Sequence, residues 1–220
     1  MNAIRTDVNF SFNFTDQCYM LSDEIKPQIL PFHIYEPIDG SCLFGNSQPL
    51  NVEIGSGNGD FILHSAINRH EENFLGFEIV KQLILKTAKK VTNNNLKNVR
   101  LIHYDATFFI KMFKHNSIKH VYVNYPDPWP KRRHHKRRLI SLDFLTLIYN
   151  KLEQNGLLYI VTDVEDYALS IMNKVLQSPF NSVYESTYIN YLDDYFETKY
   201  YKKFSKNNKT FFFKLIKEDR

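Results

Sequence analysis

The feature that most constrains this chain is a repeated alternation between apolar runs and stretches of helical periodicity. In the first repeat, the run LNVEI is typical of a buried strand, and Ile62, Leu63 and Ala66 then recur at helical spacing. A strand followed by a helix predicts parallel pairing, because the chain must cross back before it starts the next strand in the same direction. The pattern occurs five times, with apolar runs at residues 50–54, 73–78, 98–105, 118–125 and 156–163. We therefore expect an α/β fold in which a mostly parallel sheet has helices on both faces.

The two ends of the chain depart from this alternation. The runs at 182–190 and 210–218 are aromatic and β-branched but lack a long helix between them, which predicts an antiparallel pair at one edge of the sheet. Residues 1–48 show no clear periodicity, and we expect them to form an irregular or partly mobile segment. The remainder, residues 49–220, has a length that suits a single domain.

Composition argues against a membrane protein and against a metal site. No apolar run approaches the roughly 18 residues that span a bilayer, so no membrane partner is expected. The opening MNAIRTDVNF lacks the basic and apolar blocks of a secretory signal, which predicts a cytoplasmic protein. Cys18 and Cys42 stand in no metal-like spacing, and we expect no metal. The sequence is compatible with both a monomer and a homodimer.

A glycine-rich turn, EIGSGNGD at residues 53–60, joins the first strand to the first helix. Gly55 and Gly57 permit a tight turn and a close approach of a ligand to the backbone. The turn differs from a dinucleotide fingerprint, because Asp60 replaces the third glycine and would repel a pyrophosphate at the helix N-terminus. We therefore expect a nucleoside ligand that carries no phosphate.

Four consecutive strands end in or beside an acidic residue: Glu53, Glu78, Asp105 and Asp127. The carboxyl ends of parallel strands meet at one edge of the sheet, where ligands of open α/β sheets bind. Glu78 is placed to accept hydrogen bonds from ribose hydroxyls, and Glu53 is placed to face a cationic group. An anionic crevice suits S-adenosylmethionine, which carries an ammonium and a sulfonium, and we expect this cofactor.

The fourth strand runs into NYPDPWPKRRHHKRRL, at residues 124–139. Pro126 and Pro128 restrict the backbone on either side of Asp127, so its carboxylate is held in one direction. Six of the eight residues from Lys131 to Arg138 are basic, and this concentration of charge attracts a polyanion. Trp129 is suited to stack on a base or to fill a core position. Taken alone, the basic run would also suit a solvated loop or a sorting signal.

With EIGSGNGDF, FLGFE, NVRLIHYDA, PDPWPKRRHHKRRL, TDVEDYA and TKYYKKF in this order, the chain resembles the bacterial tRNA (guanine-N7-)-methyltransferase family. The resemblance covers about residues 43–204. Its most specific element is PDPW followed by K-x-R-H-x-K-R-R, where an acid between prolines and a basic strip occur together. The resemblance implies a Rossmann-like, seven-stranded class I methyltransferase sheet. It also implies methyl transfer from S-adenosylmethionine to N7 of a guanine in the variable loop of tRNA.

The resemblance further implies roles for individual residues. Asp127 matches the proposed active-site acid. The cofactor ligands by motif match are Glu53, Gly55, Gly57, Glu78, Asp105 and Ala106. The substrate contacts by motif match are Lys131, Asp163, Thr198 and Lys199. The RNA-contacting stretch matches Arg133, His134, His135, Lys136, Arg137 and Arg138.

The chemistry of guanine N7 agrees with this set of residues. N7 of neutral guanine already carries an in-plane lone pair, so its methylation requires neither a metal nor a strong base. A carboxylate can accept hydrogen bonds from the N1–H and N2–H edge, and it stabilises a purine that becomes cationic as the methyl group transfers. Asp127 and Asp163, expected at the ends of adjacent strands, are the candidates.

Two positions depart from the family pattern, and two other functions fit parts of the sequence. Tyr201 stands where the family usually has Glu, and residues 1–60 carry eight acids and two basic residues where the family often has a basic arm. An amino-group methylase is one alternative, because NYPDPWP loosely resembles [DNS]-P-P-[YFW], although Asp127 separates the prolines. A non-catalytic RNA-binding module is the other, but it has no need of the glycine turn and the acids.

Overall fold

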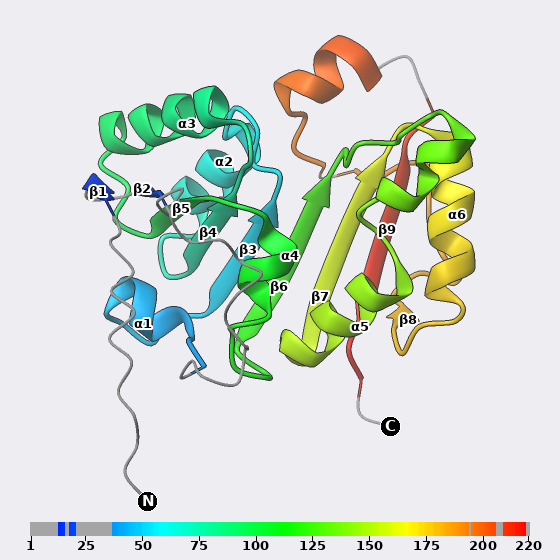
Figure 1. Ribbon diagram of the computed structural model, residues 1–220, viewed down its shortest axis with the longest axis horizontal. Coiled ribbons are helices and arrows are strands. Elements are labelled where there is room, and N and C mark those ends of the chain that lie inside the picture. The colour runs from blue at the N-terminus through cyan, green and yellow to red at the C-terminus, as the bar shows by residue number, and fades with distance from the viewer. Residues whose placement is uncertain (1–12, 16–17, 21–36, 194, 206–208, 219–220) are drawn as a thin grey trace, which may run out of the picture.

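A twisted sheet runs through the computed structural model, which describes residues 13–15, 18–20, 37–193, 195–205 and 209–218 (Figure 1). Within these residues the strand order is β1-β2-β5-β4-β3-β6-β7-β9-β8. Pairing is parallel from β2 to β7, and β9 is antiparallel to both β7 and β8. The strands are β1 (Asn13–Thr15), β2 (Cys18–Met20), β3 (Leu50–Ile54), β4 (Asn73–Phe77), β5 (Val99–His103), β6 (Ile118–Asn124), β7 (Leu152–Thr162), β8 (Asn181–Ser182) and β9 (Phe211–Ile216).

The predicted seven-stranded α/β sheet is confirmed by the neighbouring strands β5, β4, β3, β6, β7, β9 and β8. The short β1–β2 pair extends the sheet at the β5 edge. β7 begins at Leu152, four residues earlier than expected, because the preceding helix ends at Lys151 and passes directly into the strand. The strand expected over 182–190 is shorter than predicted. It consists of Asn181–Ser182 and one bridge between Ile189 and Phe212, since the Ser182 hydroxyl bonds the Ser186 carbonyl and the chain turns away.

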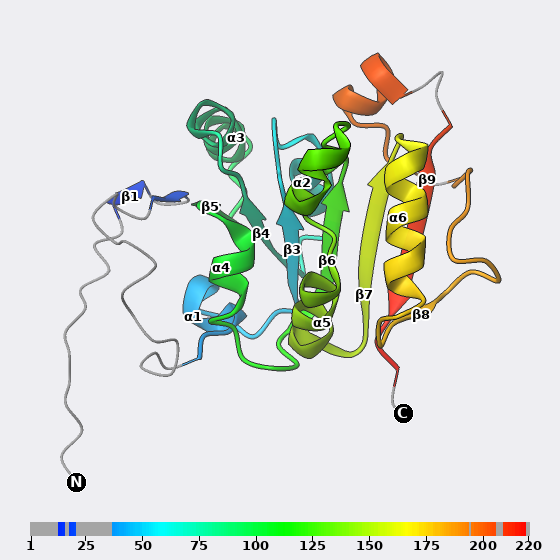
Figure 2. The ribbon, with the colours of Figure 1, turned by 45° about the vertical axis from the view of Figure 1, so that its right-hand side comes forward.

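The helices cover the two faces of the sheet unequally. The helices are α1 (Gly40–Phe44), α2 (Asp60–Asn68), α3 (Lys81–Asn93), α4 (Ala106–Ile110), α5 (Leu142–Lys151) and α6 (Glu165–Val175). α4, α5 and α6 pack on one face and enclose the larger core cluster, with α5 and α6 in front of β6 and β7 in Figure 2. α2 and α3 pack on the other face over β4 and β5, where they form a smaller cluster.

Part of the segment expected to be irregular is packed against the domain. Ile38 forms a bridge to Phe113, and Asp39 caps α1 while its carboxylate pairs with Lys114 at 2.5 Å. The hydrogen bonds from Lys114 and Ser41 lower the pKa of Asp39. Most of residues 1–36 lie outside the described residues, so the expectation for that segment stays a prediction.

The described residues contain neither a membrane-spanning helix nor a cluster of metal-ligand side chains. No helix within the described ranges is long and apolar enough to cross a bilayer. The same residues contain no group of three or more His, Cys, Asp or Glu side chains that could hold a metal ion.

Candidate active site at the carboxyl ends of the strands

A cavity of about 460 Å³ lies where the carboxyl ends of β3, β4, β5 and β6 meet. This is the edge at which the sequence places a ligand, and the volume is in the range of small-molecule sites. The predicted site residues that line the cavity are Gly55, Glu78, Asp105, Ala106, Asp127 and Arg137. The fold therefore brings together six residues that are spread over 83 positions of the sequence.

The glycine turn is held against the second strand by backbone hydrogen bonds. Gly55, Gly57 and Gly59 all have positive φ, a conformation that favours glycine. The amides of Gly55 and Ser56 donate to the Phe77 carbonyl, each at 2.9 Å. A Cβ at Gly59 would lie 2.8 Å from Leu63 Cδ1, so close packing of the following helix also requires glycine there.

Glu78 links this turn to the cavity. Its carboxylate accepts hydrogen bonds from the Gly57 amide at 2.8 Å and from the Val80 amide at 2.9 Å. The residue is 7% exposed and stands at the end of β4. Each carboxylate oxygen has a second lone pair, so Glu78 is fixed in place and still able to accept from a ligand hydroxyl.

Asp105 is fixed in a similar way at the end of β5. Its Oδ1 caps α4 by accepting from the Thr107 amide at 2.7 Å and from the Thr107 hydroxyl at 2.6 Å. The next residue, Ala106, is 5% exposed and packs in the core while it also lines the cavity. Oδ1 of Asp105 is thus committed to the helix cap, while the residue also lines the cavity.

The side chain of Glu53 does not lie in the cavity, where the sequence predicted it. It is 5% exposed and does not line the cavity, because a strand residue alternates faces and its side chain lies beneath Asn124. The Asn124 amide donates to Oε1 at 3.2 Å, and Oε2 is buried with no hydrogen-bond partner among the described residues. Burial raises the pKa of Glu53 to about 8.

The loop after β6 carries Asp127 into the cavity. Tyr125 and Trp129, on either side of the two prolines, have φ of 51° and 44°, which costs a non-glycine residue roughly 1–2 kcal/mol. The loop is held by a hydrogen bond from the Tyr125 amide to the Val161 carbonyl at 2.8 Å. Asp127 is exposed, and Trp129 is half-buried against the same cavity.

Asp163 and the segment 195–205 lie beside this loop. Burial is the main cause that raises the pKa of Tyr200, and the negative charges of Asp163 and Asp127 add to it. The Tyr200 ring lies 4.6 Å from that of Tyr125. The Lys199 amide donates to Asp60 at 3.1 Å, which ties the segment to the glycine turn.

Thr198, a predicted substrate contact on that segment, and Tyr201 both have partners within the chain. Thr198 is 8% exposed, and its hydroxyl accepts from the Tyr201 amide at 3.2 Å. The Tyr201 ring, at the position where the family usually has Glu, packs on Tyr195 with 5.3 Å between ring centroids. Neither residue lines the cavity.

The basic stretch forms a short 3-10 helix, η2 (Arg132–Arg137), on the surface next to the cavity. Lys131, Arg132, Arg133, Lys136 and Arg137 are exposed, and His134 and His135 are half-buried. The Arg137 guanidinium lies 5.0 Å from the centre of the Trp129 ring. Arg138 was also expected to contact RNA, but it is only 6% exposed. Its guanidinium points inward and donates to the Pro128 carbonyl.

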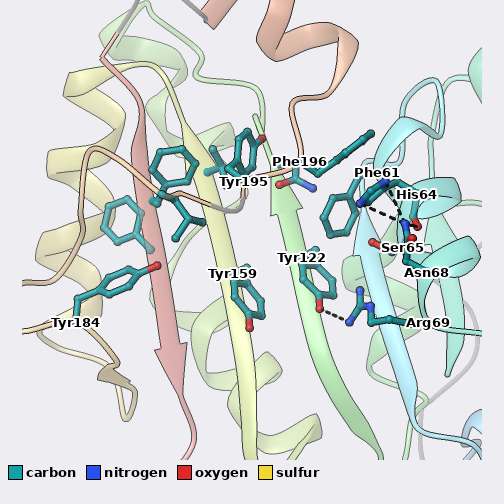
Figure 3. A pocket seen from close by; sticks show the side chains of 15 residues that line it. Phe61, His64, Ser65, Asn68, Arg69, Tyr122, Tyr159, Tyr184, Tyr195 and Phe196 are labelled. Atoms are coloured by element: carbon teal, nitrogen blue, oxygen red, sulfur yellow. Dashed lines mark hydrogen bonds between the residues drawn. The ribbon is translucent and has the colours of Figure 1, made fainter. Parts of the chain in front are cut away.

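A second cavity, of about 300 Å³, lies on the face of the sheet beside α2 (Figure 3). Tyr122 and Tyr159, paired on β6 and β7, stack there with 4.9 Å between centroids, and Arg69 donates to the Tyr122 hydroxyl at 3.1 Å. His64 stacks on Phe196 at the opposite wall. The sequence did not indicate this cavity, because alternating aromatic residues on a strand are equally typical of a buried core.

Comparison with known proteins gives a consistent result. Residues 47–214 match a family model described as a putative methyltransferase. A tRNA (guanine-N(7)-)-methyltransferase of Thermotoga maritima is 40% identical over 192 residues, which are 86% of this chain and 59% of the relative. A protein of the same name from Geobacter metallireducens is 32% identical, over 83% of this chain and 88% of the relative. The chain spans about 60% of the length of the first two curated relatives that it matches.

Solved structures with low sequence identity share the fold. An rRNA methylase from Streptococcus thermophilus superimposes with a TM-score of 0.55 at 17% identity, over 79% of this chain and 89% of that one. A 30S ribosomal A1408 methyltransferase gives a TM-score of 0.58 at 14% identity, over 81% and 91%. A putative methyltransferase from Streptococcus mutans, in complex with SAH, gives 0.52 at 18%, over 78% and 90%. The fold is that of the class I S-adenosylmethionine-dependent methyltransferases.

Proposed function

The chain belongs to the tRNA (guanine-N(7)-)-methyltransferase family, and from this premise we propose that it methylates N7 of a guanine in the variable loop of tRNA. The methyl donor in this proposal is S-adenosylmethionine. The observation that carries the proposal is the meeting of Glu78, Asp105 and Asp127 in one cavity beside an exposed basic helix. That arrangement combines a nucleoside site, a carboxylate for the base and cations for the phosphates.

The residues of the cavity fit the cofactor. Glu78 and Asp105 are held by backbone amides in positions from which they can accept from ribose hydroxyls and from the adenine side. Glu53 Oε2 and the Ser56 hydroxyl, which do not line the cavity, are buried without hydrogen-bond partners among the described residues. When bound, S-adenosylmethionine supplies the electrophilic methyl group.

Asp127 is the group best placed to act on the base. Its carboxylate can accept from N1–H and N2–H of the guanine and so present N7 toward the methyl donor. Holding the two reactants in line can supply about 7–11 kcal/mol of the barrier. As N7 becomes alkylated the purine gains positive charge, and the nearby carboxylate of Asp127 stabilises it. Trp129, in the same wall of the cavity, offers a ring against which the base can stack.

The exposed part of the basic stretch is suited to the RNA backbone. Arg133 and Lys136 on η2 and Lys131 just before it are exposed, and Arg137 lines the cavity. Cations of this kind contact phosphates and fix the position of a nucleic acid without reading its sequence. A tRNA bound there would have its target base next to Asp127.

The proposal is tested by incubating the protein with S-adenosylmethionine labelled in the methyl group and with total tRNA, followed by digestion to nucleosides. We expect the label in 7-methylguanosine, and mapping of the modified position to the variable loop. Label in N6-methyladenosine would instead support an amino-group methylase. Binding of tRNA without any transfer, and without affinity for the cofactor, would support an RNA-binding module. The variant Asp127→Asn provides the matched control for transfer that depends on the cavity.

A further inference from the structure

Arg138 is the one basic residue of the stretch Lys131–Arg138 that the fold buries. Its side chain is 2% exposed, while the neighbouring Arg137 is exposed and faces the cavity. Burial of an arginine is costly unless its donors are all engaged, so the contacts of Arg138 indicate what it does.

The first contact is with the loop that carries Asp127. Arg138 Nε donates to the Pro128 carbonyl at 2.8 Å. Pro128 follows Asp127 directly, so this hydrogen bond holds the peptide next to the catalytic candidate. The carboxylate of Asp127 itself forms no hydrogen bond to any described residue, and its position therefore depends on the backbone of the loop.

The second set of contacts is with the start of α6. Arg138 Nη2 forms a short ion pair with Asp166, and the guanidinium lies 4.7 Å from the centre of the Tyr167 ring. Tyr167 is fully buried, and its hydroxyl accepts from the Ile140 amide at 3.1 Å. Asp166 is three residues beyond Asp163, the second acid expected to contact the base.

We propose that Arg138 is a positioning residue that joins the Asp127 loop to the first turn of α6, just after Asp163, and so sets the spacing of the two carboxylates around the base. The inference rests on the proposed function, and it replaces an RNA-backbone contact for this residue. A guanidinium suits the task because its donors point in fixed directions, one toward Pro128 and one toward Asp166. An amine of the same charge cannot reproduce both bonds in one geometry.

The contacts of Arg138 with Pro128 and Asp166 are called the clasp. The test uses two variants of the clasp and two matched controls. Asp166→Ala removes the partner whose side chain is 68% exposed, so the fold is retained, and Arg138→Lys keeps the charge. Glu165→Ala removes the neighbouring exposed acid of the same helical turn, and Arg137→Ala removes the adjacent exposed arginine. Urea unfolding of each variant confirms that it is folded before kinetics are compared.

For both clasp variants we expect kcat to fall by about tenfold or more, with KM for tRNA and the salt dependence of tRNA binding close to wild type. Glu165→Ala should leave all of these unchanged. Arg137→Ala should instead weaken tRNA binding and flatten its salt dependence. An Arg138→Lys variant with wild-type kcat would overturn the inference. A third variant, Arg138→Ala, removes the charge, and a change in the salt dependence of tRNA binding like that of Arg137→Ala would also overturn the inference.

A second readout does not depend on activity. Trp129 is the only tryptophan of the chain and follows Pro128, so its fluorescence reports on the loop that Arg138 holds. Acrylamide quenching of Trp129 should increase in Asp166→Ala and stay at the wild-type level in Glu165→Ala. Unchanged quenching in Asp166→Ala would overturn the inference. If the wild-type protein methylates no tRNA, the proposed function fails, and the quenching measurement alone still decides whether Arg138 orders the loop.

Discussion

The two cavities share the side chain of Asn124 but are built from different parts of the fold. The cavity at the strand ends is lined by loops, and its acids Glu78 and Asp105 are aimed by backbone amides. The cavity on the sheet face is lined mainly by aromatic rings that pack on one another, such as Tyr122 and Tyr159.

This difference supports the proposal that methyl transfer takes place in the first cavity. Binding of a nucleoside and methylation of a base require charged and polar groups that are fixed in direction. Loops at the carboxyl ends of the strands can present such groups from four strands at once, whereas a sheet face presents only the side chains that its own core requires.

The largest effect is expected from Glu53, which lies beneath Asn124 where the two cavities meet. Burial raises the pKa of Glu53 to about 8, so the folded state holds a proton that the unfolded state releases near pH 4.5. The stability that protonated Glu53 contributes is therefore fully present below about pH 4.5. It is lost as pH rises toward 8, and the loss is on the order of a few kcal/mol. Glu53→Gln, compared with wild type by urea unfolding at pH 5 and pH 8, should remove most of this decline. A difference between the two proteins that does not vary with pH would contradict the prediction.

Asp127→Asn should lower methyl transfer by about 100-fold or more, because the lost charge acts mainly on the cationic state of the base. Affinity for S-adenosylmethionine, measured by calorimetry, should stay nearly unchanged. Near wild-type turnover in this variant would remove Asp127 from its role and weaken the assignment of the reaction to the first cavity.

Glu78→Ala should weaken binding of S-adenosylmethionine by about 1.5–3 kcal/mol, the range for lost charge-assisted hydrogen bonds. The variant also leaves the Gly57 amide without its partner, so the glycine turn loses part of its support. A dissociation constant equal to that of wild type would argue against ribose binding at this residue.

Arg137→Ala should reduce the magnitude of the slope of log K for tRNA against log salt by about 0.7–0.9, the value for one phosphate contact. Affinity for the cofactor should change little. If the slope stays the same and tRNA affinity is normal, the exposed basic helix does not bind the RNA backbone.

The smallest effect is expected in the second cavity. Tyr159→Phe removes a hydroxyl that has no hydrogen-bond partner among the described residues, and we expect stability to change by no more than about 0.5 kcal/mol. Methyl transfer and cofactor affinity should match wild type in the same assays. A clear loss of transfer would show that the second cavity takes part in the reaction, and the contrast between the cavities would fall.

Sequence alone determined the fold class and most of the candidate site. The period of the apolar residues separates strand from helix, and the positions of Glu78, Asp105 and Asp127 at strand ends follow from it. Parallel strands bring their carboxyl ends to one edge, so these acids had to meet.

Packing between distant elements set which of the predicted residues line the cavity and which are buried. Arg138 and Arg137 are neighbours in a uniform basic run, yet only Arg138 is buried, because its guanidinium contacts Asp166 and Tyr167. These two residues lie 28 and 29 positions further along the chain. Lys199 likewise meets Asp60 across 139 positions. Periodicity describes the neighbours of a residue within its own element, whereas burial and pairing depend on elements that are distant in sequence, and these are set only when the chain is packed.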